Sequence, residues 1–382
     1  MKVVAIDSMK GCLGSGEASE ACAWGERERM PDAEVIAVPV ADGGEGTAAA
    51  IAFSNEGIRR RRSRVPGPDG NDVDAEWWMD EVNKKAYIDM AAAAGLTLLP
   101  EEKRNPMKTM TYGVGQLILA AIDEGAKQIV VGMGGSATVD GGMGACEALG
   151  VRFIKAKDFL EPEQNASNTG DTLEIEDIDD SGIDPRLKEA EILLACDVTA
   201  PFTGEKGAAR VFGPQKGANP LEVELLERRL ENLRKMILKK YGLNLNDIPG
   251  SGAAGGCAGG LVALAGAKIE KGASLVLDSI GFDEIIEDAD LIITGEGSAD
   301  RQTLMGKLPF EILQRGKRNG IPVVLVAGKI QDKEDLENAG FAEVMDINSE
   351  ENIERSNTRG EEAMDPEVAK KRLGVVGSGI FL

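Results

Sequence analysis

The sequence predicts an α/β fold built around parallel sheets. Short, continuous apolar runs recur along the chain, for example VVAID at 3–7 and LIIT at 291–294. Runs of this length and composition are typical of strands that are buried on both faces of a sheet. Helix-like stretches alternate with them, as expected of an α/β architecture. Most runs end in a loop rich in Gly or Asp, which indicates ligand-binding loops made of backbone.

The expected elements follow this alternation along the chain. From their apolar composition we expect strands at 3–7, 35–40, 129–132, 192–196, 291–294 and 323–328. We expect helices at 15–29, 44–55, 113–124, 221–240, 306–319 and 332–339, and a small-residue helix that begins within 250–260. Ligands of such sheets bind beyond the carboxyl ends of the strands, so the loops that follow the runs are the expected functional loops.

Two stretches depart from this alternation. Residues 58–89 carry the turn signals PGPDG and DEVNKK between short extended runs, which predicts antiparallel hairpins. Their basic run, Arg59–Arg62 with Arg64, is expected to be a solvated strand face rather than a phosphate site. Residues 156–190 are polar and irregular, and we expect a surface excursion without chemistry.

The two ends of the chain have the plain strand–helix alternation, whereas the middle holds the hairpins, a long charged helix and several Gly-rich loops. We therefore expect one discontinuous α/β domain, made of residues 1–64 and 277–382. A second, mixed α/β domain, residues 65–276, is expected to be inserted into it. The tail KKRLGVVGSGIFL contains three glycines and is expected to fray or to pack differently from a charged helix.

Composition excludes several classes of partner. Lys and Arg number 43 against 65 Asp and Glu, and the net charge of −22 argues against nucleic acid and anionic membranes as partners. Small anions remain possible ligands, because local N–H groups and a single Lys outweigh a distant surface charge. The five Cys form no CxxC motif, and no apolar run reaches the ~20 residues of a membrane span. We expect a cytoplasmic protein with reduced thiols.

The motifs that are missing narrow the chemistry further. The absence of His excludes Ser-His-Asp hydrolysis, HExxH metalloproteases and phosphohistidine chemistry. No GxxxxGK[ST] motif and no HRD motif occurs, so the chain is neither a P-loop kinase nor a protein kinase. Phosphoryl transfer nevertheless needs only donors around the phosphates, a carboxylate-bound Mg²⁺ and a carboxylate that takes the alcohol proton.

The loops after the apolar runs supply these groups. Glycines, hydroxyls, lysines, an amide and a carboxylate are expected to contact substrate or phosphate: Ser8, Gly43, Gly44, Gly134, Gly135, Ser136, Thr138, Asp140, Gln215, Lys216, Gly295, Gly297 and Lys307. As metal ligands we expect Glu296 and Asp300, and as catalytic residues Lys10, Asp42 and Asp197. Each of these, taken singly, is also a common cap or turn residue.

Several of these segments together resemble a known family. The motifs DSMKG, PVADGGEGT, MAAAAGL, RNPMKTMTYGVG, GGSATVDGG, ACDVTAPFTGEKGAARVFGPQKGA, GSGAAGG and TGEGSADRQTLMGK occur in this order between about residues 2 and 330. They resemble the bacterial type I glycerate kinases. The resemblance implies a flavodoxin-like (Rossmann-like) parallel-sheet domain built from both chain ends. It also implies an inserted domain likened to restriction enzymes, and ATP-dependent phosphorylation of D-glycerate, at the 2-hydroxyl in well-known members.

On this hypothesis the chain transfers phosphate from ATP to D-glycerate with Mg²⁺, in a cleft between the two domains, and 2-phosphoglycerate is favoured over 3-phosphoglycerate as product. Asp197 is expected to act as the base, with Asp42 on the glycerate side or as the base in its place. Lys10 or another cation is expected to meet the glycerate carboxylate. A homodimer is possible.

One loop departs from the family pattern. Ser298 and Ala299 stand where the family loop usually carries Arg and a hydrophobic residue, so Arg301 is a candidate substitute. The departure keeps a non-catalytic sensor of glycerate or nucleotide open as an alternative. A nicotinamide-dependent hydroxy-acid oxidoreductase is a further alternative, although no clean GxGxxG follows the first strand and His is absent.

Overall fold

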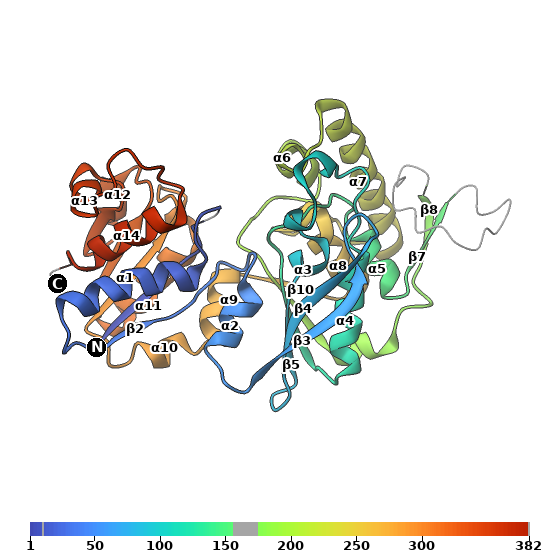
Figure 1. Ribbon diagram of the computed structural model, residues 1–382. Coiled ribbons are helices and arrows are strands. Elements are labelled where there is room, and N and C mark those ends of the chain that lie inside the picture. Colours follow the sequence, from blue (N-terminus) through green and yellow to red (C-terminus); the bar gives the residue numbers. More distant parts are fainter. Residues whose placement is uncertain (10, 156–174, 381–382) are drawn as a thin grey trace. The chain divides into compact units, whose positions relative to one another are not determined.

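The computed structural model describes the chain from residue 1 to 380, apart from residue 10 and residues 156–174 (Figure 1). The chain forms two compact units. Unit 1 consists of Met1–Asp42, Ala50–Asn55 and Ala273–Leu382, and unit 2 of Gly43–Ala49 and Glu56–Gly272. No helix of the described residues is long and apolar enough to cross a membrane.

Unit 1 is built on a fully parallel sheet to which both chain ends contribute. Its order is β13-β12-β11-β1-β2. The strands are β1 (Lys2–Ile6), β2 (Val35–Ala37), β11 (Leu291–Glu296), β12 (Val323–Ala327) and β13 (Glu343–Asp346). Counted along the chain within this sheet, the order is 2-1-3-4-5, which is that of flavodoxin-like folds. The flavodoxin-like prediction for the two chain ends is therefore confirmed.

The helices of unit 1 lie between these strands and at its end. They are α1 (Ser15–Arg29), α9 (Gly272–Ser279), α10 (Phe282–Ile285), α11 (Leu308–Asn319), α12 (Lys333–Asn338), α13 (Glu350–Arg355) and α14 (Pro366–Gly377). Helix α2 (Thr47–Phe53) is divided between the two units. The interior strands β1 and β12 are buried along their whole length, as the apolar runs predict for a sheet covered on both faces.

Unit 2 contains a mixed sheet of order β10-β9-β6-β5-β4-β3. Its strands are β3 (Ile58–Pro66), β4 (Asp72–Asp80), β5 (Lys85–Asp89), β6 (Gln128–Gly132), β9 (Glu191–Ala195) and β10 (Lys268–Glu270). β3, β4 and β5 are antiparallel hairpins, as expected, and β5, β6, β9 and β10 are parallel. A separate ribbon pairs β7 (Arg152–Lys155) with β8 (Ile175–Asp179).

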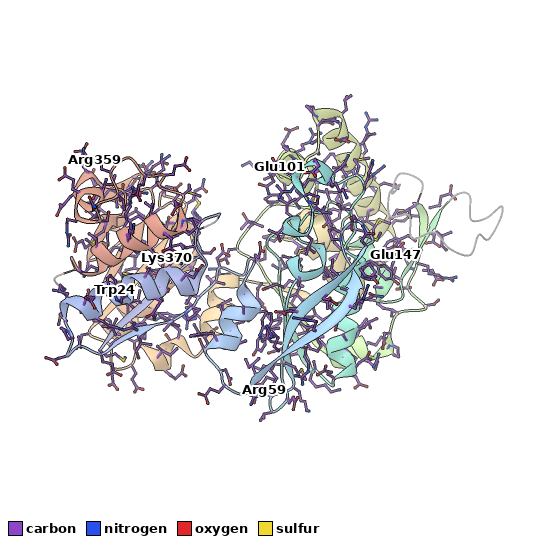
Figure 2. The ribbon with its side chains drawn as sticks, in the orientation of Figure 1. Trp24, Arg59, Glu101, Glu147, Arg359 and Lys370 are labelled. Carbon is purple, nitrogen blue, oxygen red and sulfur yellow. The ribbon has the colours of Figure 1, made fainter. Side chains whose placement is uncertain are left out.

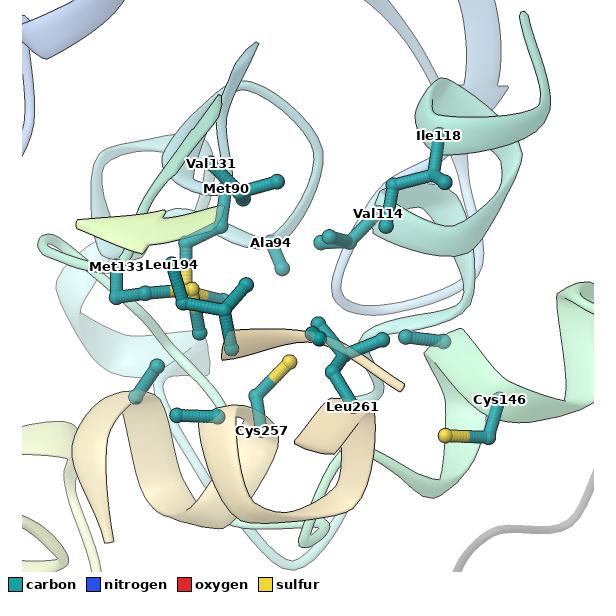
Figure 3. Packing of buried hydrophobic residues seen from close by; sticks show 14 of the residues in the cluster. Met90, Ala94, Val114, Ile118, Val131, Met133, Cys146, Leu194, Cys257 and Leu261 are labelled. Carbon is teal, nitrogen blue, oxygen red and sulfur yellow. The ribbon is translucent and has the colours of Figure 1, made fainter. Parts of the chain in front are cut away.

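Six α-helices complete the described part of unit 2. They are α3 (Ala91–Ala94), α4 (Tyr112–Asp123), α5 (Met143–Ala148), α6 (Ala208–Phe212), α7 (Pro220–Tyr241) and α8 (Cys257–Ala265). Figure 3 shows part of the core, where Val131 of β6, Val114 of α4 and Leu261 of α8 come together. The expected small-residue helix is α8, which is preceded by a short 3₁₀ turn at Ala253–Gly256.

The domain boundaries differ from those expected at residues 64 and 276. Residue 64 lies inside β3, which pairs with β4 from Ile58 to Pro66, so the whole strand belongs to unit 2. Residue 276 lies inside α9, and unit 1 resumes at Ala273. Strand pairing and helix continuity thus move the boundaries to just before β3 and to the first turn of α9. Of the expected surface excursion, 156–174 lies outside the described residues, and 175–179 form β8.

The basic run on β3 is paired with carboxylates. Arg61 binds Glu81 and Glu124, Arg62 binds Glu76 at 2.7 Å, and Arg64 binds Asp72 at 3.1 Å. Most of these side chains are exposed, and exposed pairs of this kind are worth about 0–1 kcal/mol each. The prediction of a solvated strand face is confirmed.

Helices α1 and α14 lie side by side and join the two ends of the chain (Figures 1 and 2). Their contact depends on glycine: a Cβ at Gly25 would overlap the carbonyl oxygen of Gly374, and one at Gly377 would overlap that of Cys22. Trp24 covers Gly374, and Lys370 pairs with Glu17 at 3.2 Å. Of the two expectations for the tail, fraying is wrong for its residues 370–377, which belong to α14, whereas different packing is confirmed, because these glycines let the two helices touch.

This contact predicts that replacing two glycines of α1 by alanine will have different effects on the stability of the protein. Gly25→Ala should lower the free energy of unfolding by about 3 kcal/mol, because the new methyl group has backbone in its place. Gly16→Ala is the matched control, since its Cβ would make only ordinary contacts of 3.5 Å with Pro39. Helix propensity should make the control neutral or more stable by about 0.5 kcal/mol. Chemical denaturation of both variants measures this, and equal stabilities would contradict the close contact.

Candidate active site

A pocket lies in unit 1 where the chain changes direction in the sheet. β1 leads to β2 on one side and β11 leads to β12 on the other, so the carboxyl ends of β1 and β11 form a topological switch point. Ligands of open α/β sheets bind at such points. Here the pocket has a volume of about 530 Å³. Its lining combines apolar residues (Met9, Cys12, Ile347, Ala363, Met364, Ala369) with polar ones (Asp7, Ser8, Asp42, Glu296, Ser298, Lys307, Lys329, Asn348) and Gly297 and Gly328.

Glu296, the last residue of β11, is a buried carboxylate of this pocket that is held by two side chains. Its Oε1 accepts a hydrogen bond from the Thr303 hydroxyl at 2.6 Å, and its Oε2 pairs with Lys307 Nζ at 3.3 Å. Burial raises the pKa of Glu296, and these two partners act in the opposite direction. Lys307 stands at the start of α11, with its side chain about one-third exposed.

The second metal candidate, Asp300, is placed differently. Its Oδ1 accepts a hydrogen bond from the Gln302 amide at 2.7 Å, and its own amide donates to the Thr303 hydroxyl at 3.0 Å. It belongs to the same turn as Glu296 but is not among the residues that line the pocket. The described residues contain no group of three or more His, Cys, Asp or Glu side chains placed to hold a metal by themselves.

The loop after β1 forms another side of this pocket. Asp7 is buried and its Oδ1 accepts the amide of Ser8 at 2.7 Å. Asp42 reaches the same pocket from the loop after β2. Lys10 lies outside the described residues. Gly295 is inside β11, where a Cβ would overlap the carbonyl oxygen of Val326, so strand packing explains this glycine without a ligand.

In unit 2, two Gly-rich loops are in backbone contact beyond the carboxyl ends of β6 and β9. The Met133 amide donates to the carbonyl of Gly43 at 3.0 Å. A Cβ at Gly134 would come within 2.5 Å of Gly44 Cα, and one at Gly135 within 2.8 Å of Glu45 Oε2. The predicted residues Gly43, Gly44, Gly134 and Gly135 are therefore brought together, and Gly134 must be glycine because it faces the backbone of Gly44.

A buried lysine organises the next part of the second loop. Lys216 is 3% exposed, and its Nζ donates to Ser136 Oγ at 2.6 Å and to the Thr138 carbonyl at 2.8 Å. Burial lowers the pKa of Lys216 to about 7, although the nearby charge of Asp140 opposes the shift. Thr138 Oγ1 is buried and finds no hydrogen-bond partner among the described residues. The structure thus joins Lys216 to Ser136 and Thr138.

Asp140 serves the loop itself. Its carboxylate accepts hydrogen bonds from the Thr111 amide and hydroxyl and from the amides of Gly142 and Gly144, at 2.8–3.2 Å. Burial raises the pKa of Asp140, and these donors act against the shift. A carboxylate saturated by four donors holds the turn that leads into α5.

Two further predicted residues, Asp197 and Gln215, lie in neighbouring segments of unit 2. Asp197 follows β9 and is half-buried, two residues beyond Ala195, whose carbonyl accepts from the Met133 amide at 3.2 Å. It therefore lies at the same edge of the sheet as the Gly-rich loops. Gln215 is exposed in the 3₁₀ turn Pro214–Lys216, whereas its neighbour Lys216 points inward.

Asp89, the last residue of β5, is a buried residue at this edge that the sequence analysis missed. Its carboxylate accepts the amides of Gly46 and Ala48, both at 3.1 Å, and so ties down the first Gly-rich loop. Burial raises the pKa of Asp89 to about 7. A carboxylate that ends the apolar run KAYID, just before MAAAAGL, is the signal that was available in the sequence.

Comparison with known proteins assigns these features to a family. The sequence model of the glycerate kinase family matches residues 2–370. The chain belongs to the glycerate kinase family. It is 42% identical over 330 residues to the glycerate 2-kinase of Escherichia coli, covering 86% of this chain and 85% of that protein. It is 43% identical over 328 residues to the glycerate kinase of Halalkalibacterium halodurans, with coverages of 86% and 85%.

A solved structure agrees with this membership. The crystal structure of a putative glycerate kinase 2 from Salmonella typhimurium LT2 matches with a TM-score of 0.79 and 37% sequence identity, over 99% of this chain and 96% of that one. The chain is therefore a kinase that phosphorylates glycerate, with ATP implied as the co-substrate. Membership in a kinase family disfavours the sensor and the oxidoreductase considered from the sequence.

The loop that departs from the family pattern, with Ser298 and Ala299 in place of Arg and a hydrophobic residue, borders this pocket. Ser298 lines the pocket, and Ala299 is fully buried, with its amide donating to the carbonyl of Lys329. Arg301 does not replace the missing guanidinium, because it is exposed and pairs with Asp335. Among the described residues that line the pocket, the cations are Lys307 and Lys329.

The buried lysine predicts a specific pH dependence of stability. Between pH 7 and about 10, unfolded Lys216 holds a proton that the folded protein has lost, so the free energy of unfolding should rise with pH. Its contribution is at most about 1.4 kcal/mol per pH unit. Lys216→Met should remove this rise, whereas the exposed control Lys206→Met should keep it. Denaturant titrations at pH 7, 8 and 9 measure the slopes, and equal slopes in all three proteins would contradict a deprotonated Lys216.

Proposed function

We propose that this kinase transfers the γ-phosphoryl group of ATP to the 2-hydroxyl of D-glycerate, with Mg²⁺, and releases 2-phosphoglycerate and ADP. The observation that carries the proposal is the pocket of unit 1 at the switch point of its parallel sheet. Its volume is in the range of small-molecule and cofactor sites, roughly 300–1,000 Å³. Glycerate alone is far smaller than this, so a nucleotide is the better occupant.

The residues that line the pocket suit a nucleotide, because apolar side chains are available for its base and cationic side chains for its phosphates. Met9, Ile347 and Ala369 offer apolar surface to an adenine ring. Lys307 and Lys329 offer positive charge to the phosphates, and the Gly297 loop allows close approach of backbone. The Gly-rich loops and Lys216 of unit 2 would then serve the anionic groups of the substrates. That both units contribute reacting groups remains a prediction from the sequence.

The carboxylates of the pocket fit a magnesium ion that arrives with the nucleotide. Mg²⁺ prefers oxygen ligands and is usually held by one or two carboxylates together with substrate phosphates. Asp7, Asp42 and Glu296 line one pocket, and we assign the metal to Glu296, with Asp300 in the adjoining turn as the second candidate. When bound, the ion neutralises charge on the phosphates.

The protein's own groups complete the reaction. We propose that Asp197 takes the proton of the 2-hydroxyl, with Asp42 as the alternative base. The hydroxyl oxygen then forms its bond to the γ-phosphorus while the bond from that phosphorus to the bridging oxygen breaks and ADP leaves. Lys10 or another cation would hold the glycerate carboxylate. We also propose that the enzyme acts in the cytoplasm, where the five unpaired cysteines would stay reduced.

The overall reaction is tested with the purified chain, ATP and D-glycerate. We expect formation of ADP and 2-phosphoglycerate, complete loss of turnover in excess EDTA, and recovery on addition of Mg²⁺. Phosphorus NMR of the product distinguishes the 2- from the 3-phosphate. Turnover that survives EDTA would refute the metal assignment, and a 3-phosphate product would refute the position of transfer.

The two candidate bases are separated by substitutions that keep size and remove charge. Asp197→Asn should lower kcat by about 10²-fold or more while the melting temperature changes little. Asp42→Asn should raise KM for glycerate, and the exposed Asp288→Asn is the matched control that should leave both constants unchanged. If Asp197→Asn keeps most of its activity and Asp42→Asn loses it, Asp42 is the base.

A further inference from the structure

Asp89 links three segments at the carboxyl edge of the sheet in unit 2. Its Oδ2 accepts the amide of Gly46 and its Oδ1 that of Ala48, so the carboxylate holds the loop 43–47 where it enters α2. A Cβ at Gly132, the last residue of β6, would come within 2.8 Å of Asp89 Oδ1. The carboxylate therefore fills the space between the end of β6 and the loop, and neither neighbour can move toward it.

The loop needs such an anchor because its own residues give it little stiffness. Gly43 and Gly46 have φ values of +87° and +91°, which side chains disfavour, and glycine has the largest conformational freedom when it is not held. Beyond the loop, the Met90 amide donates to the Gly132 carbonyl at 3.0 Å, so Asp89 stands on a fixed part of the sheet. The carboxylate thus fixes the end of the loop next to α2, while the Met133 amide holds its start through the Gly43 carbonyl.

We propose that Asp89 is a positioning residue for phosphoryl transfer, acting by holding the Gly-rich loop 43–47 in place rather than by touching a substrate. The proposal rests on the proposed function of this loop in binding substrate anions. Donors displaced by about 1 Å can cost roughly 10²-fold in rate. Asp89 is only 8% exposed and does not itself contact substrate in this proposal. Loss of the anchor should nevertheless reduce turnover, because the loop would be displaced.

The anchor is sensitive to pH. The charged carboxylate accepts both amides, whereas its protonated form is a weaker acceptor, and burial places the pKa at about 7. Glu45, on the loop, is the charged side chain whose field acts on Asp89 and favours protonation. The neighbouring residues of β6 and α2 that contact the carboxylate, Gly132 and Ala48, carry no charge. The loop should therefore loosen as pH falls through 7. As a consequence, kcat/KM should decline on the acid side of its pH profile, and this decline is called the acid limb below.

This limb is opposite in sign to the effect of the buried lysine, Lys216. Lys216 loses its proton as pH rises through about 7, so any contribution of its charge to substrate binding declines on the alkaline side. A fall in activity toward acid pH therefore cannot come from Lys216. The direction of the limb separates the two groups before any variant is made.

Asp89→Asn and Asp80→Asn form a matched pair of variants. Asp80 is also a buried aspartate at a strand end and also accepts two backbone amides, those of Val82 and Asn83. It belongs to the turn between β4 and β5, at the opposite end of β5 from Asp89. Both substitutions weaken an amide-holding carboxylate, but only one of them affects the Gly-rich loop.

The first measurement is hydrogen exchange at the amides of residues 43–48, followed by mass spectrometry and corrected for intrinsic rates. In the wild type we expect protection to be at least tenfold greater at pH 8 than at pH 6. In Asp89→Asn we expect low protection at both pH values, and in Asp80→Asn we expect the wild-type pattern. Protection in the wild type that is independent of pH, or unchanged in Asp89→Asn, would overturn the proposal without reference to activity.

The second measurement is kcat/KM for ATP and D-glycerate between pH 5.5 and 9. We expect Asp89→Asn to lose about 10- to 100-fold at pH 8 and to lack the acid limb, while Asp80→Asn keeps both rate and limb. A variant that loses activity but keeps the wild-type limb would show a merely structural role and overturn the proposal. Absence of turnover in the wild type would refute the kinase proposal instead, and the exchange experiment would still decide the role of Asp89.

Discussion

The contact of one backbone with another at the carboxyl ends of buried strands is the constraint on which the candidate site depends. In unit 2 the loop 43–47 lies directly on the loop 132–136, and a single methyl group at Gly134 would separate them. Because glycine alone permits this approach, amide groups of two loops are presented together at one edge of the sheet. The polar anchors, Asp89 for one loop and Lys216 for the other, then determine how firmly each is held.

The same edge of the sheet also holds several buried ionisable side chains. The cost of burying each one is offset by hydrogen bonds to neighbouring groups. Asp89 and Asp140 are carboxylates surrounded by amides and hydroxyls, and Lys216 is an ammonium group that donates to a hydroxyl and a carbonyl. Their hydrogen-bond partners are dipoles rather than opposite charges, and the strength of these bonds depends on protonation. Burial raises the pKa values of both acids and lowers that of the base, and the pKa values of Asp89 and Lys216 both lie at about 7.

Much of the architecture was predictable, because local pattern determines it. The helix expected at 15–29 is α1, and the runs ending before Ser8 and Gly297 are strands whose following loops line the pocket. The features that the sequence analysis missed depend on contacts between residues that are far apart in the chain. Nothing near Asp89 in the chain indicates that its partners are more than forty residues earlier, and the boundary at residue 64 was placed without the register of β3. The ligand contact predicted for Gly295 stays a prediction, but its strand neighbour Val326 already requires glycine at this position.

The order of the strands in unit 1 also governs how the chain can assemble during synthesis. β1 pairs with β11 in the register Lys2↔Leu291, so the central pair of that sheet joins residues separated by most of the chain. The sheet of unit 2 is complete once Glu270 has left the ribosome, whereas the first strand of the protein must wait for its neighbour. β2 is available early to pair with one edge of β1, but the edge that faces β11 stays unpaired during this interval and is a template for pairing with other chains. Nascent-chain protection by chaperones should therefore matter most for residues 2–6.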